Sequence, residues 1–70
     1  MDKIKVREIA RRMKLWNSEL FERFIMERFP DEGSETYIGE WADRFLSGNP
    51  VCYMDDESKE AYLKVIKGLK

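Results

Sequence analysis

The 70-residue chain has 43% hydrophobic and 13% aromatic side chains, enough for one hydrophobic core in a single domain. Its lone cysteine, Cys52, excludes an intrachain disulfide framework and fits a reducing compartment. The sequence contains neither the run of about 18 apolar residues that a membrane-spanning helix needs nor a secretory signal pattern. We therefore expect a soluble cytoplasmic protein that has no membrane partner.

The net charge of −1 conceals an uneven distribution along the chain. Six basic and two acidic residues give residues 1–17 a charge of +4, whereas seven basic and twelve acidic residues give residues 18–70 a charge of −5. Such an asymmetry indicates either an interaction surface or an internal arrangement in which the two parts attract each other. The sequence leaves both alternatives open.

Residues 3–16 are predicted to form the first helix, because apolar residues recur there at helical spacing. Its apolar face consists of Val6, Ile9, Ala10, Met13 and Trp16. A basic stripe on the opposite face consists of Arg7, Arg11 and Lys14. Since Ile4 lies off the apolar face, residues 4–6 are interpreted as an extended lead-in to this helix.

A turn at residues 16–18 precedes the second predicted helix, which ends near Phe29 because Pro30 follows. Asn17 or Ser18 suits the N-cap position, where a side-chain oxygen accepts from a free amide. The apolar half of this helix contains Leu20, Phe21, Phe24, Ile25 and Phe29. Its polar half is mainly acidic and contains Glu19, Glu22, Arg23 and Glu27.

The most regular helical pattern lies at residues 36–47, where apolar and polar positions separate completely into two halves of the helical wheel. The apolar half contains Tyr37, Ile38, Trp41, Ala42, Phe45 and Leu46. Ser34 or Glu35 is predicted to start this helix, and Gly48 suits a left-handed C-terminal cap. A face this wide needs neighbouring helices to cover it.

Residues 51–54 are too few for a full helix and are predicted to form a single turn or packed loop that buries Cys52. Asp55 suits the N-cap of a last helix. The apolar face of that helix contains Ala61, Tyr62, Val65, Ile66 and Leu69. The complete pattern predicts an all-α fold, a single compact domain over residues 1–70 with about four short helices.

Most catalytic chemistry is disfavoured by the composition. The chain has no histidine, which is the commonest general base and metal ligand, and Cys52 lacks the usual activating partner. The acidic clusters at 31–35 and 55–57 lack the spacing of a calcium-binding loop and suit helix starts instead. We therefore expect no enzyme activity, no cofactor, no metal and no small-molecule substrate.

Residues 7–25 combine two amphipathic segments with a short turn between them. Apolar residues occupy matching positions in both segments and the turn, at Ile9, Ala10, Met13, Leu15, Leu20 and Phe24. In this pattern the stretch resembles the helix-turn-helix segments of DNA-binding regulators, which usually carry glycine in the turn where this chain has Lys14. The resemblance implies phosphate contacts by Arg7, Arg11 and Lys14. It implies base contacts by Asn17, Ser18 and Arg23.

Nine aromatic side chains are too many for four short helices to bury completely. We expect partly exposed side chains, and a protein-binding patch, among Trp16, Met26, Tyr53, Met54 and Leu63. The leading interpretation is a small non-catalytic helical interaction module, an adaptor or regulator that binds another protein or itself. The alternative is a helix-turn-helix-like nucleic-acid-binding regulatory domain.

Overall fold

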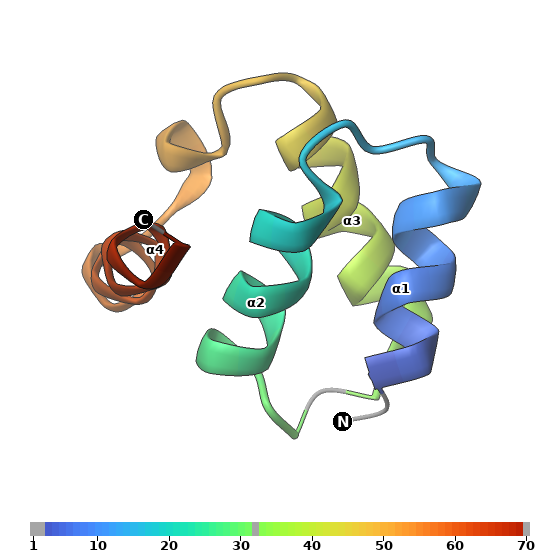
Figure 1. The fold of residues 1–70 in the computed structure, drawn as a ribbon, viewed down its shortest axis with the longest axis horizontal. Coiled ribbons are helices and arrows are strands. Elements are labelled where there is room, and N and C mark those ends of the chain that lie inside the picture. Colours follow the sequence, from blue (N-terminus) through green and yellow to red (C-terminus); the bar gives the residue numbers. More distant parts are fainter. Residues whose placement is uncertain (1–2, 32, 70) are drawn as a thin grey trace.

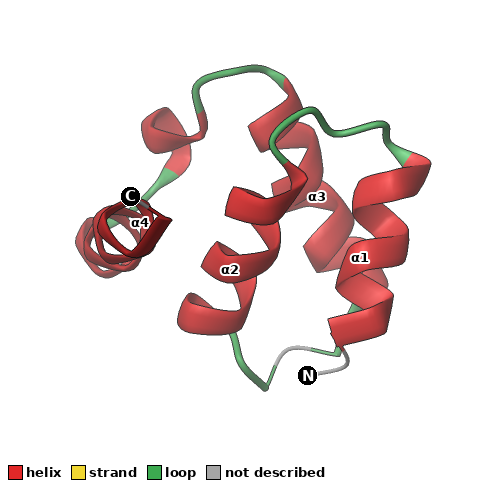
Figure 2. Ribbon diagram, viewed as in Figure 1, coloured by secondary structure: helices red, strands yellow, loops and turns green. Residues whose placement is uncertain are grey.

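The computed structural model describes residues 3–31 and 33–69, and in that part the chain is helical without any strand (Figure 1; Figure 2). Its elements are α1 (Lys3–Arg12), α2 (Ser18–Arg28), α3 (Glu35–Leu46), the 3₁₀ helix η1 (Pro50–Tyr53) and α4 (Asp56–Leu69). The predicted all-α class with four short helices is therefore confirmed.

The first three helices run up, down and up in Figure 1, and α4 lies at the left beside α2, pointing toward the viewer so that it is seen along its axis. α1 packs on both α2 and α3, while α4 packs mainly on α2. As a result, α1 and α3 finish at the same end of the bundle at which α2 begins, at the top of Figure 1. We call this the turn end; η1 follows α3 on this side.

Phe24 of α2 lies at the centre of the core and is fully buried. Its ring centroid lies 5.1 Å from that of Trp41 and 5.5 Å from that of Phe45, both on α3. It also lies 6.0 Å from Phe29 and 6.2 Å from Tyr62 of α4. These tilted and edge-to-face contacts are the preferred arrangements of aromatic pairs. One aromatic cluster therefore joins α2, α3 and α4, and the aliphatic face of α1 closes it with Val6, Ile9 and Ala10.

α1 ends four residues earlier than predicted because a left-handed residue terminates it. Lys14 has φ 53°, and its N–H donates to Arg11 O at 3.0 Å. The next N–H, of Leu15, donates to Ala10 O at 3.0 Å, and both of those side chains are buried. This pair of bonds is that of a Schellman C-cap, and both side chains belong to the core cluster. Trp16 therefore lies beyond the helix, and its predicted place on the helical face is wrong.

Three further expectations are corrected. Residues 4–6 belong to α1, so the predicted extended lead-in is wrong; helical backbone there buries Val6. Cys52 is exposed rather than buried, whereas Met54 is buried rather than exposed. The reason is the tight turn of η1, which carries residues 51–53 outward before the extended backbone of Met54 returns its side chain to the core.

The caps predicted for the two long helices that follow Pro30 are largely confirmed. Ser34 caps α3 by accepting from Tyr37 N–H at 3.3 Å. Gly48 has φ 92° and its N–H donates to Phe45 O at 3.1 Å, as a left-handed cap requires. Asp55 accepts from Ser58 N–H at 2.8 Å at the start of α4. The side chain of Leu69 lies outside the described residues.

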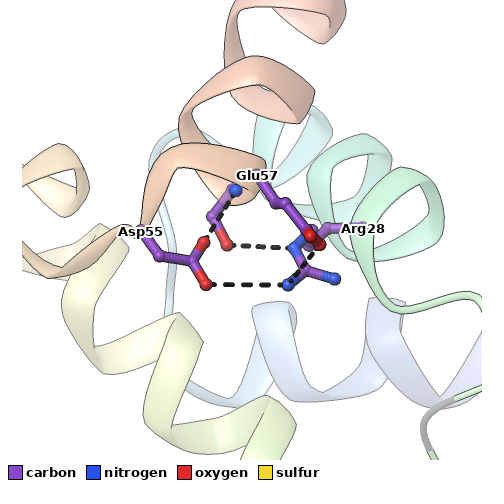
Figure 3. A network of polar contacts seen from close by, with 4 residues as sticks. Arg28, Asp55 and Glu57 are labelled. Carbon is purple, nitrogen blue, oxygen red and sulfur yellow. Dashed lines mark hydrogen bonds and ion pairs between the residues drawn. The ribbon is translucent and has the colours of Figure 1, made fainter.

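Arg28, in the last turn of α2, fixes the start of α4 (Figure 3). Its Nε donates to Ser58 Oγ at 3.1 Å, and its Nη2 lies 3.3 Å from Glu57 Oε2 and 3.7 Å from Asp55 Oδ2. Ser58 is buried and the arginine is largely covered, so the contacts are partly shielded from water. This network links the two helices at the edge of the aromatic cluster.

We predict that Asp55 makes folding sensitive to acid. Hydrogen bonds from the Ser58 backbone and side chain, and then the charge of Arg28, hold the pKa of Asp55 below its usual range. Because the folded-state pKa is the lower one, this stabilisation is present above the unfolded-state value of about 3.9 and is lost as pH falls through the folded-state pKa. The Tm of Asp55→Asn, measured by circular dichroism, should therefore fall less between about pH 5 and pH 3 than the Tm of the parent protein.

Asparagine keeps an acceptor for the N-cap but carries no titrating charge, so the variant separates the two roles of Asp55. Asp56→Asn, one residue further along α4, is the matched control and should retain the acid sensitivity of the parent. An equal loss of Tm in the parent and in Asp55→Asn would contradict the prediction.

Candidate protein-binding surface

Most of the exposed large hydrophobic side chains of the described chain lie at the turn end. Trp16, 73% exposed, lies in the α1–α2 turn, and Leu46, 41% exposed, closes α3. Val51 and Tyr53, 37% and 57% exposed, belong to η1 on the same side (Figure 1). Leu63 on α4 is the exception. We call the first four residues the apolar end; their common location sets them apart from singly scattered hydrophobics, which need no explanation.

A shallow groove of about 500 Å³ runs along the outer side of α3 and reaches η1. It is lined by Glu40, Asp43, Arg44, Leu46, Ser47 and Tyr53. Two members of the apolar end, Leu46 and Tyr53, therefore form its apolar walls. Its volume lies in the range of ligand sites, about 300–1,000 Å³, so the groove can accommodate a large side chain.

Arg44 fixes the Tyr53 wall of this groove. Its guanidinium carbon lies 4.7 Å from the centroid of the Trp41 ring and 5.5 Å from that of Tyr53. Both contacts are cation–π interactions, and they join α3 to η1. Arg44 forms no ion pair with any residue of the described chain, so its charge is engaged by these two rings. The exposed Tyr53 ring is consequently held in place rather than left free.

Two carboxylates, Glu40 and Asp43, give the groove an acidic rim. Both lie on α3, and Glu40 is exposed, as is Asp43. Neither forms an ion pair within the described part of the chain. With Arg44 also in the lining, the two carboxylates leave the groove with a net charge of −1 (one positive minus two negative). This charge favours a partner of opposite charge, because complementary charge steers association and selects against other partners. The groove therefore suits a basic partner.

The opposite charge lies in what we call the basic turn, Arg11, Arg12 and Lys14, next to Trp16. All three cations are exposed and unpaired within the described residues. The other basic residues nearby behave differently: Arg7 lies 3.0 Å from Glu22 Oε1, and Arg23 lies 3.1 Å from Glu19 Oε1. The charge asymmetry of the sequence thus serves both internal pairing and a free basic surface.

The structure separates the five side chains predicted to form one protein-binding patch. Trp16 and Tyr53 both lie at the turn end, but Leu63 lies on α4. Met26 is half-buried and lines a hollow of about 310 Å³ between α1 and α2, where Arg7 and Arg23 also lie. Met54 is a core residue.

The residues that sequence reasoning missed are Leu46 and Val51. Leu46 falls on the apolar half of α3, but it lies in the last turn, where the cover from neighbouring helices runs out. The signal that could have found it is its position two residues before the capping glycine. The groove itself depends on η1 folding back beside α3, which no local pattern predicts.

The residues predicted to contact nucleic acid are only partly brought together. Arg11, Lys14, Asn17 and Ser18 lie in or beside one turn, whereas Arg7 and Arg23 are paired with glutamates. Asn17 holds the N-cap position of α2 without a side-chain cap bond, and its Oδ1 is buried without a partner.

No group of three or more potential metal-ligating side chains occurs among the described residues, and none of the described helices has the length and apolarity to cross a membrane. Of the predicted acidic clusters, Glu32 lies outside the described residues, while Asp55 and Glu57 contact Arg28.

Comparison with known proteins adds no functional assignment. No protein-family model matches the chain, and no curated protein or solved structure matches it. Its function therefore has to be inferred from its own residues.

We predict that the two tryptophans report on opposite environments. Trp16 is largely exposed and Trp41 is 3% exposed, so acrylamide should quench the first strongly and the second weakly. In dilute solution, Trp16→Phe should shift the remaining tryptophan fluorescence to shorter wavelength and remove most of the quenching by acrylamide. Quenching that is unchanged in this variant would contradict the exposure of Trp16.

Proposed function

We propose that this protein is a small non-catalytic helical interaction module, an adaptor or regulator that binds another protein through the groove beside Tyr53. The observation that carries the proposal is the location of Trp16, Leu46, Val51 and Tyr53 at one end of the bundle. An apolar centre with a charged rim is the common arrangement of protein interfaces.

The groove also defines the chemistry of the partner. Its apolar walls, Leu46 and Tyr53, suit an aromatic or other large apolar side chain, and its rim, Glu40 and Asp43, suits flanking lysine or arginine. Arg44 already holds the Tyr53 ring, so less conformational entropy is lost on binding. The fitting partner segment therefore combines an aromatic residue with nearby basic residues.

We predict that a short peptide with a central Lys-Trp-Lys sequence binds this groove weakly, with a dissociation constant of about 1 mM. The measurement is a ¹⁵N-resolved NMR titration with the blocked peptide, in which amide shifts should concentrate at residues 40–47 and 53. Peptides with Glu-Trp-Glu or Lys-Ala-Lys at the centre should bind more weakly, because each lacks one of the two complementary features.

Tyr53→Ala and Leu63→Ala form a matched pair for the same titration, since the two side chains are almost equally exposed, at 57% and 56%. The first variant should weaken peptide binding several-fold, and the second should leave it unchanged. Shifts that are absent, or that are the same with all three peptides, would overturn the proposed function.

A helix-turn-helix-like nucleic-acid-binding regulatory domain is the second candidate, and the backbone of Lys14 favours it. Its left-handed conformation, φ 53°, occurs at the turn position where such families usually carry glycine. The exposed Arg11 and Lys14 suit phosphate contacts. The ion pairs of Arg7 and Arg23 weigh against it, because they occupy two of the six residues that the resemblance selects.

Under this second candidate, duplex DNA should shift amides only at residues 7–14 and 17–23, and its affinity should fall steeply between about 50 and 200 mM salt. Reversing Arg11 and Lys14 to Glu should abolish the response while circular dichroism shows a folded domain. A flat titration at the lower salt concentration, where electrostatic binding is strongest, removes this candidate.

A further inference from the structure

We infer that the fitting partner is a second copy of this chain, so that Trp16 and the basic turn of each copy occupy the groove of the other. The inference rests on the proposed function, since it uses the same groove. The occupant of the groove is formed by residues that the chain itself exposes.

The first argument is chemical complementarity. The groove suits an aromatic side chain with cations beside it, and Trp16 is the most exposed large hydrophobic residue described. The basic turn lies on its N-terminal side, with Lys14 two residues before it, and no cation follows it before Arg23. The unpaired carboxylates Glu40 and Asp43 would meet cations that are unpaired in the single chain. Association thus compensates charge on both sides at once.

The second argument is the rigid presentation of Trp16. The Schellman bonds from Lys14 N–H and Leu15 N–H close the end of α1, and the buried Leu15 side chain anchors the turn to the core. Trp16 comes next in the chain, between this anchor and the start of α2. A side chain presented by a fixed turn loses less backbone entropy when it binds, which favours a specific contact.

The third argument is symmetry. The α1–α2 turn and the last turn of α3 both lie at the turn end of the bundle (Figure 1). The basic turn belongs to the first, and Leu46 and Ser47 of the groove lining lie at the second. A two-fold axis at that end lets one copy donate Trp16 and accept the Trp16 of the other, so the assembly closes at two copies. Surfaces at opposite ends would instead produce an open chain of molecules. The location therefore predicts a dimer rather than a polymer.

We predict a reversible monomer–dimer equilibrium, measured by sedimentation equilibrium over a wide concentration series. Standard interfaces bury about 800 Å² per partner, which would be a large share of the 4652 Å² surface of so small a protein. We therefore expect an interface below the standard size, and hence a weak dimer. Dimerisation should weaken as salt rises, because the paired charges lie at a rim exposed to solvent. Trp16→Ala should weaken it at least tenfold, whereas Leu63→Ala should change it less than twofold.

A charge exchange makes the inference falsifiable without relying on a single variant. One variant carries Glu40→Lys and Asp43→Lys, and the other carries Arg11→Glu and Lys14→Glu. In a dimer of either variant, both contacts between groove and basic turn would bring like charges together. Each variant alone should therefore remain monomeric. An equimolar mixture pairs a basic groove with an acidic turn, and an acidic groove with a basic turn, so it should restore dimers.

A monomer at every concentration, a dimer that is insensitive to Trp16→Ala, or a mixture that fails to associate would each overturn the inference. Its failure is distinguishable from that of the proposed function. A monomeric protein that still binds the Lys-Trp-Lys peptide at residues 40–47 retains the interaction groove for a different protein. Loss of both dimer and peptide binding removes the groove itself as an interaction site.

Discussion

The packing around Phe24 is the constraint on which the rest of the structure depends. Its ring contacts aromatic residues of α3 and α4 from its place on α2, so a single buried side chain sets the position of three helices. Full burial of such a side chain contributes about 1.5–3 kcal/mol, a large part of the margin of a small domain. Because short connections join α1 to α2 and α2 to α3, α2 runs opposite to both, and α1 and α3 finish together at the turn end, where the candidate surface lies.

Two arginines extend this core to its periphery in the same way. Arg28 lies 4.8 Å from the Phe29 ring centroid and pairs with the start of α4, while Arg44 lies between Trp41 and Tyr53 and holds η1. Arginine suits both positions because its planar guanidinium stacks on rings and is weakly hydrated. The difference between them is their charge partners: Arg28 has two carboxylates, whereas Arg44 has rings alone within the described chain. Tyr53 is therefore ordered by its contact with Arg44 and yet remains accessible to a partner.

Periodicity in the sequence was enough to predict the fold class. Most helix limits were also predictable, because Pro30, Ser34, Gly48 and Asp55 end or begin helices through their own backbone or side chains. The end of α1 was not predictable in this way, since Lys14 adopts a conformation that its residue type does not announce. Similarly, which side chains in and next to η1 are buried and which are exposed depends on where this four-residue turn meets α3. Of the candidate surface, Trp16 and Tyr53 could be predicted as unburied aromatics, but the groove is a tertiary feature.

Lys14 also connects the two candidate functions and makes them compete. Its left-handed turn presents Arg11, Lys14 and Trp16 together, and the same cations serve phosphate in one proposal and the carboxylates Glu40 and Asp43 of a second copy in the other. A cation cannot satisfy both partners at once, so self-association covers the surface that nucleic acid would need. Helix-turn-helix dimers that bind DNA place their basic surfaces outward, in register with two half-sites. A dimer that buries the basic turn is therefore incompatible with that arrangement, and demonstrating it would argue directly for a protein-binding role.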